Sequence, residues 1–133
     1  MITKGVKQLV EEANAEIETV PLDAAKALLE DDSVVFVDIR DVRELDREGM
    51  IPGAMHAPRG MLEFWIDPDS PYHKDIFASG KKFLLYCAGA QRSALAAKAI
   101  QDMGLKPVAH LEGGFGGWIE AGGPTVDRPR REK

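Results

Sequence analysis

The sequence has little cysteine, no long apolar run and no surplus of positive charge. Its single cysteine excludes an internal disulfide and fits the reducing cytoplasm, where we expect the protein to be located. No apolar stretch approaches the roughly 20 residues that a helix needs to cross a bilayer, and residues 1–7 lack the apolar core of a signal peptide. The formal net charge of −5 argues against general binding to nucleic acid or to anionic membranes.

A chain of 133 residues suits one domain, with enough buried surface to fold without disulfides or metals. We predict a helical extension over residues 1–15, a domain over 16–125 and a tail over 126–133. Val6, Leu9, Val10 and Ala13 have the spacing of one helix face. This helix would pack either on the domain or on a second copy of the chain, so a monomer and a homodimer both remain open.

Predicted strands and helices alternate along the chain, which favours a parallel sheet covered on both faces. We therefore predict an α/β fold with a central parallel sheet of about five strands. The expected strands are 16–20 (a short edge strand), 34–38, 55–57, 83–86 and 108–111. The expected helices and helical turns are 22–30, a turn within 41–48, part of 58–66, 75–78, 93–103 and 118–121.

The only cysteine, Cys87, stands between a buried strand and a helix that starts near Ser93. Backbone N–H groups of the small intervening residues would point inward, and the helix start adds positive potential. Such a site favours thiolate over thiol and can hold an anion beside it. Arg92 closes the loop with a permanent charge suited to an oxyanion. We therefore predict Cys87 as the catalytic residue, with substrate bound by Ala88, Gly89, Ala90, Gln91, Arg92 and Ser93.

The pattern Cys-x-x-x-x-Arg-Ser between a strand and a helix resembles the active-site loop of the rhodanese family. Three other segments match that family in the same order. Residues 35–41 look like its strand ending in Asp-x-Arg, and residues 49–54 look like its Gly-His-Ile-Pro-Gly-Ala segment with Met50 in place of the histidine. Residues 111–118 look like its closing Gly-Gly-x-x-x-Trp segment. Together the matches span about residues 20–124, so the resemblance implies a rhodanese-like domain.

The resemblance implies a sulfurtransferase. A sulfane sulfur would pass from a small donor such as thiosulfate to Cys87, forming a persulfide, and then to cyanide or a thiol. The acceptor could also be a thiol on another protein. The chain has no second cysteine to take up the persulfide sulfur, so the acceptor must come from outside. The resemblance implies no cofactor and no metal.

Two other functions remain open. Cysteine phosphatases and arsenate reductases also use a loop between Cys and Arg, usually a longer one with five intervening residues in the phosphatases, whereas four lie between Cys87 and Arg92. The shorter loop should make a tighter ring of N–H donors, suited to one added sulfur rather than to a phosphoryl group. A rhodanese-like module that binds or senses sulfide without turnover is the second alternative.

The loop departs from the family at its fourth position, where Ala90 replaces a glycine. If the backbone there needs a positive φ, alanine costs roughly 1 kcal/mol. Otherwise Gly89 could take the unusual conformation and the loop could still close.

Other polar residues have both a functional and a structural interpretation. Asp38, at the end of a strand, could orient loop groups, although a helix cap or a structural ion pair is the simpler interpretation. His56 is a candidate base, but we predict a structural role for it, because thiolate chemistry needs no base once the loop favours the thiolate form. His110 is also predicted to be structural, because it lies inside an expected strand. Four further residues could line a substrate pocket or merely pack and stay exposed: Arg59, Trp65, Tyr72 and His73.

Overall fold

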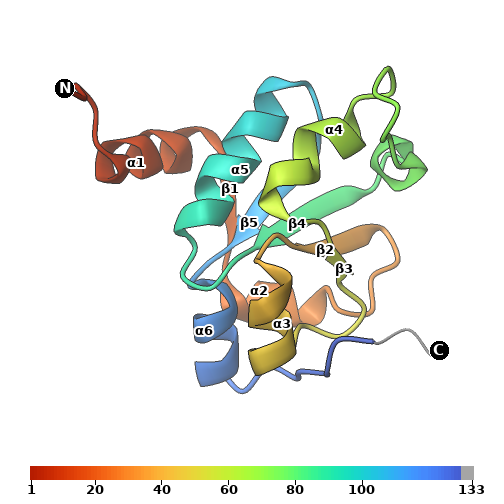
Figure 1. Ribbon diagram of the computed structural model, residues 1–133. Coiled ribbons are helices and arrows are strands. Elements are labelled where there is room, and N and C mark those ends of the chain that lie inside the picture. Colours follow the sequence, from red (N-terminus) through yellow and green to blue (C-terminus); the bar gives the residue numbers. More distant parts are fainter. Residues whose placement is uncertain (130–133) are drawn as a thin grey trace.

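The computed structural model describes residues 1–129 and contains a five-stranded sheet in the order β1-β5-β4-β2-β3. All four strand pairs are parallel. Helices cover both faces of the sheet (Figure 1). The strands are β1 Glu18–Val20, β2 Val34–Asp38, β3 Met55–His56, β4 Lys82–Tyr86 and β5 Val108–Leu111. The predicted fold class is therefore confirmed.

Two apolar cores lie on opposite faces of the sheet. In β4, Phe83 and Leu85 face the core under α1, α4 and α5, whereas Leu84 and Tyr86 face the core on the side of α2 and α6. A strand buried on both faces has no polar side to alternate with, which explains its continuous apolar run. The helices are α1 Val6–Glu16, α2 Leu22–Ala27, α3 Val42–Glu48, η1 Arg59–Met61, α4 Leu62–Ile66, η2 Asp75–Ala78, α5 Gln91–Asp102 and α6 Gly114–Glu120.

The N-terminal helix α1 lies at the side of the domain and packs against α5 (Figure 1). Ala13 is buried where the two helices meet, but Val6 and Leu9 nearer the N-terminus are exposed. The Gln101 amide of α5 donates to the Glu16 carbonyl at the end of α1, at 2.9 Å. The helix therefore docks on its own domain through its C-terminal half, and its role in a homodimer stays a prediction.

The last helix differs from its prediction. We expected a glycine-rich turn followed by a helix from Trp118, but α6 already begins at Gly114. Glycine is a poor helix former, which is why the sequence favoured a turn. Packing overrides that preference, because the first turn of α6 lies against the loop after β4 and its amides bind that loop.

The segment after α6 returns to the domain. Val126 forms an antiparallel bridge with Met50, and Arg128 makes an ion pair with Asp46 at 2.8 Å. The predicted tail thus begins with residues that are paired, while residues 130–133 lie outside the described part of the chain. Over residues 1–129, no helix is both long and apolar enough to cross a membrane.

Candidate active site

Cys87 directly follows β4 at the carboxyl edge of the sheet, the edge where parallel α/β sheets bind ligands. Its side chain is only 1% exposed. The Ser93 amide, in the first turn of α5, donates to Cys87 Sγ at 3.4 Å. The Cys87 thiol in turn donates to Ser93 Oγ at 3.5 Å. The fold therefore brings together the first and last residues of the predicted loop, with a hydroxyl and an amide at the sulfur.

Helix α6 fixes the opposite side of this loop. The Phe115 amide donates to the Cys87 carbonyl at 2.7 Å, and the Gly116 amide donates to the Ala88 carbonyl at 3.1 Å. Gly114 has a φ of +63°, and a Cβ there would lie 2.6–2.7 Å from the same two carbonyl oxygens. Only glycine permits this approach. The sequence showed the glycines but not that they position the cysteine loop.

Ala90 itself adopts the left-handed conformation, with a φ of +68°, immediately before α5. Among residues 1–129 it is the only non-glycine residue with a positive φ, and Gly89 does not share that conformation. Of the two alternatives for the loop, the strained alanine is the correct one. The loop thus makes a left-handed turn at a residue that is not glycine.

Ala90→Gly is expected to raise the free energy of unfolding by about 1 kcal/mol, because glycine adopts a positive φ without the Cβ penalty. Urea denaturation of the variant and the wild type at neutral pH measures this difference in the free energy of unfolding. The reverse change, Gly122→Ala, is the control, since Gly122 has a φ of +77° with no atom near its would-be Cβ. That variant should lose about 1 kcal/mol. An Ala90→Gly variant no more stable than the wild type would contradict a strained loop.

Arg92 is held by a carboxylate from α3. Its Nη1 and Nη2 donate to Glu44 Oε1 and Oε2, each at 3.0 Å. These hydrogen bonds raise the pKa of Arg92 and lower the pKa of Glu44. The Arg92 side chain remains 44% exposed. The guanidinium therefore points to the surface beside the loop, and an incoming anion must share it with Glu44 or displace that carboxylate.

A pocket of about 270 Å³ lies beside Arg92, formed by the segments that follow β2 and β3. Arg59, which also binds Glu63 at 2.8 Å, is a second cation on its wall. Cys87 is not among the lining residues. The complete lining is Ile39, Arg40, Asp41, Pro58, Arg59, Gly60 and Arg92. The pocket is large enough for a small anion and has two surface guanidinium groups to attract one.

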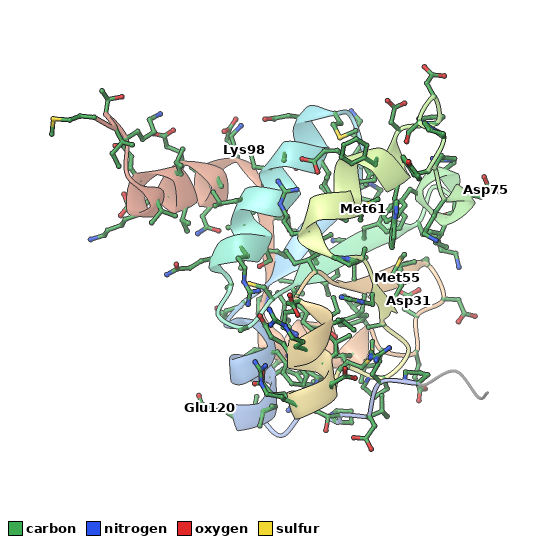
Figure 2. The ribbon with its side chains drawn as sticks, viewed as in Figure 1. Asp31, Met55, Met61, Asp75, Lys98 and Glu120 are labelled. Atoms are coloured by element: carbon green, nitrogen blue, oxygen red, sulfur yellow. The ribbon has the colours of Figure 1, made fainter. Side chains whose placement is uncertain are left out.

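The aromatic segment after η1 does not line this pocket. Tyr72 is exposed, and Lys74 Nζ lies 4.4 Å from the centre of the Trp65 ring in a cation–π contact. His73 lies 3.8 Å from Asp75. A larger pocket of about 500 Å³ lies elsewhere, with Asp31 and Met55 on its lining (Figure 2), and none of the predicted site residues reaches it. Of the four optional pocket residues, only Arg59 reaches the pocket beside Arg92.

Asp38 and Arg40 form a buried ion pair between the sheet and α3. Both side chains are fully buried. Arg40 Nη2 donates to Asp38 Oδ2 at 2.8 Å and to the Gly49 carbonyl at 2.7 Å, and Arg40 Nε donates to Asp38 Oδ1 at 3.0 Å. Burial acts to lower the pKa of Arg40, but Asp38 outweighs it and the pKa is raised. Asp38 is thus a structural partner, the simpler of its two interpretations. His56 is structural too, with Nε2 2.7 Å from the Arg40 carbonyl oxygen.

His110 lies closer to the sulfur than the sequence suggested. It is 2% exposed on β5, and its Nδ1 is 2.9 Å from Ser93 Oγ, the hydroxyl that meets Cys87. Burial lowers the pKa of His110, which favours the neutral ring. The expectation of a purely structural role rested on sequence position alone. The sequence did contain one relevant signal. His110 lies in a predicted strand, and pairing of that strand with the strand before Cys87 would bring the histidine near the cysteine.

Comparison with known proteins identifies the family. The rhodanese-like domain family matches residues 21–121. The chain belongs to the rhodanese-like domain family. The predicted resemblance is confirmed, and the matched range starts after α1 and β1 and runs through α6.

Individual relatives agree on the domain. A Bacillus subtilis protein named as a candidate sulfurtransferase, YtwF, is 30% identical over 77% of this chain and 91% of its own length. A Synechocystis protein without an assigned function is 32% identical over 81% of this chain. This chain spans only 55% of that relative's length.

Two solved structures share this rhodanese-like fold over nearly the whole chain. A Rhodopseudomonas palustris protein of unknown function, described as a possible tyrosine phosphatase, is 60% identical, with a TM-score of 0.92 over 95% of this chain and 97% of its own. A polysulfide-sulfur transferase from Wolinella succinogenes, a homodimer, is 29% identical. Its TM-score is 0.69 over 96% of this chain and 90% of its own.

Proposed function

We propose that this protein is a sulfurtransferase that carries a sulfane sulfur on Cys87. The observation that carries the proposal is the position of the only cysteine. It directly follows a buried strand, accepts a hydrogen bond from the first turn of α5, and is separated from Arg92 by four residues. Membership of the rhodanese-like family and the sulfur-transferring relatives support the same reaction.

The first half-reaction needs only a thiolate and an anionic donor. The Cys87 thiolate attacks the outer sulfur of thiosulfate, and a new S–S bond forms. The S–S bond of thiosulfate breaks, and sulfite leaves with its electron pair. Arg92, with Arg59 across the pocket, would hold the sulfonate end of the donor. The Ser93 amide would donate to the charged sulfur.

The second half-reaction returns the enzyme to its starting state. An external thiolate attacks the outer sulfur of the persulfide, the S–S bond to Cys87 breaks, and the Cys87 thiolate is released. Cyanide would do the same and leave as thiocyanate. No outside oxidant or reductant is consumed in either step. Since the chain has one cysteine, each turnover requires an acceptor molecule that enters the site.

Intact-protein mass spectrometry after brief incubation with thiosulfate tests the proposal. The wild type should gain the mass of one sulfur atom, reversibly with dithiothreitol, because Cys87 is the only thiol. Cys87→Ser should gain nothing. A gain that persists in Cys87→Ser would exclude Cys87, and no gain in the wild type with thiosulfate or polysulfide would end the proposal.

Turnover distinguishes the enzyme from a module that only binds sulfur. Burial of Cys87 and the Arg92–Glu44 contact both favour slow exchange, so this second function has support. Repeated thiocyanate production from thiosulfate and cyanide would indicate an enzyme, whereas one stoichiometric burst would indicate a module. Hydrolysis of p-nitrophenyl phosphate in the same preparation would instead support the phosphatase activity suggested for the Rhodopseudomonas palustris protein.

A further inference from the structure

A chain of polar contacts links Cys87 to the surface beside α1. Cys87 Sγ lies 3.5 Å from Ser93 Oγ, and Ser93 Oγ lies 2.9 Å from His110 Nδ1. On the other side of the ring, His110 Nε2 lies 2.9 Å from Asn14 Oδ1 and 3.2 Å from Thr19 Oγ1. Cys87, Ser93 and His110 are buried, whereas Asn14 and Thr19 are exposed. The chain thus runs from a buried thiol to solvent.

The hydrogen-bond partners set a direction for each proton. The Asn14 carbonyl oxygen beside Nε2 can only accept, which favours the His110 tautomer that carries its proton on Nε2 and leaves Nδ1 as an acceptor. Ser93 must then donate its hydroxyl proton to Nδ1. Its oxygen lone pairs are left to accept from the Cys87 thiol. The Cys87 S–H, the Ser93 O–H and the His110 Nε2–H therefore each donate to the next group along the chain of contacts, in the direction from the sulfur to the surface.

We propose that His110 accepts the Cys87 proton through Ser93, and that Asn14 is the positioning residue that holds His110 in the required tautomer. The proposal rests on the proposed function, because it concerns how the same sulfur becomes a nucleophile. His110 acts through Ser93 and does not touch the reacting sulfur.

The transfer balances without any other reactant. The thiol proton moves to Ser93 Oγ while the Ser93 hydroxyl proton moves to His110 Nδ1, leaving a thiolate and an imidazolium. The imidazolium then donates to Ser93, and Ser93 donates to the sulfur anion. Together with the Ser93 amide, this gives the thiolate two donors. The imidazolium can release its Nε2 proton to solvent beside Asn14 and Thr19.

The ring starts in the form that the transfer needs. Burial lowers the pKa of His110 and keeps it neutral before the thiol ionises. The groups that contact it from α5, α1 and β1 are Ser93, Asn14 and Thr19, all uncharged. Among the hydrogen-bond partners described within residues 1–129, none of the groups that contact the ring can therefore titrate. The proposed proton exchange is with the Cys87 thiol, through the Ser93 hydroxyl.

The inference gives α1 a role in the site. Asn14 lies in α1 and Thr19 in β1, both before the family-matched range of 21–121. α1 is held against α5, the helix that begins at the cysteine loop, by the Gln101–Glu16 hydrogen bond and by the Lys98 Nζ–Glu16 Oε2 ion pair at 3.1 Å. A segment outside the family domain thus supplies the outer end of the proton path.

Alkylation of Cys87 by iodoacetamide tests the relay without any sulfur donor, so its failure is separate from failure of the sulfurtransferase proposal. His110→Gln keeps a polar side chain but cannot take the proton. It should lower the alkylation rate at pH 7 by about tenfold, and by less than about twofold at pH 9.5, where hydroxide removes the proton directly. A loss of equal size at both pH values would indicate a merely structural histidine and overturn the proposal.

Surface variants keep the test valid if His110→Gln does not fold. Asn14→Ala should slow alkylation at pH 7 by about threefold or more, and Asn14→Asp, which restores an acceptor oxygen, should recover at least the wild-type rate. Glu12→Gln is the matched control. It removes an exposed ion pair of α1, between Lys4 and Glu12 at 2.8 Å, away from the relay and should stay within about twofold of the wild type. Equal rates in Asn14→Ala and the wild type would overturn the role of Asn14.

The tautomer can be observed directly. Two-bond ¹H–¹⁵N spectra of the wild type at pH 7 should show a neutral His110 ring protonated on Nε2. In Asn14→Ala the spectra should show a mixture of tautomers. A ring protonated on Nδ1 in the wild type would reverse the direction of the Ser93 hydrogen bond and would contradict the relay.

Discussion

Asp38→Asn should lower the free energy of unfolding by about 3–5 kcal/mol, the usual cost of removing one partner from a buried ion pair. The change leaves the Arg40 guanidinium, whose side chain is fully buried, without its carboxylate. The remaining contacts are the Gly49 carbonyl, the Tyr86 and Phe115 rings, and the Glu48 carboxylate, whose Oε1 lies 3.9 Å from Arg40 Nη1. Glu48 is the one charged group among them, and it is half-exposed and too distant for a hydrogen bond, so it compensates little. The loss is a penalty for isolating Arg40 rather than the net value of the pair.

Asp41→Asn is a matched control three residues away. Asp41 pairs with Arg43 at 3.0 Å, but both side chains are largely exposed. Asparagine also caps a helix well, and α3 begins directly after Asp41. The control should therefore lose less than about 1 kcal/mol. Urea denaturation of both variants at pH 7 measures the difference, and similar losses in the two would contradict the assigned role of the buried pair.

Arg92→Ala should lower kcat/KM for thiosulfate by about 100-fold, because a charged donor that binds the anion and its transition state is lost. Stability should change by less than about 1 kcal/mol, since the Arg92–Glu44 pair is partly exposed to solvent. Initial rates of thiocyanate formation and urea denaturation, measured on the same samples, give the two numbers. Unchanged kinetics would remove Arg92 from the site.

Two further variants separate charge from geometry at this position. Arg92→Lys keeps the charge but loses the two-pronged contact, so its kcat/KM should fall between those of the wild type and Arg92→Ala. Arg43→Ala removes an exposed arginine that does not itself line the pocket, although its partner Asp41 does, and it should retain most of the wild-type rate. A rate loss in Arg43→Ala as large as in Arg92→Ala would indicate general attraction of anions.

The sequence predicted the strands and helices that are indicated by a local pattern of residues. β2 and β5 have the predicted limits, because short, mostly apolar runs are typical of buried parallel strands. β2 is also rich in β-branched residues. Cys87 was placed at a strand end because the apolar run stops there and a helix follows. α2 was predicted too long: it ends at Ala27, where a turn over residues 28–30 replaces the last helical residues.

The features that the sequence did not predict depend on contacts between residues far apart in the chain. Nothing local indicates that His110 meets Ser93, because that contact needs the side-chain direction in β5 and the docking of α5 across the sheet. The pairing of Glu44 with Arg92 joins residues 48 positions apart. The conformation of Ala90 contradicts its own preference, so only the closed loop reveals it. Each of these features results from tertiary packing.

The close fit of α6 against the cysteine loop also determines how a donor can reach the sulfur. Two amides tether the carbonyls of Cys87 and Ala88, and Gly114 leaves no space between them and α6. This rear side of the loop cannot retreat without breaking both tethers. An opening that admits a donor is therefore expected on the opposite side of the loop, beside the Arg92–Glu44 pair. On the proposed function, the route to the sulfur and the group that binds the donor would then lie side by side.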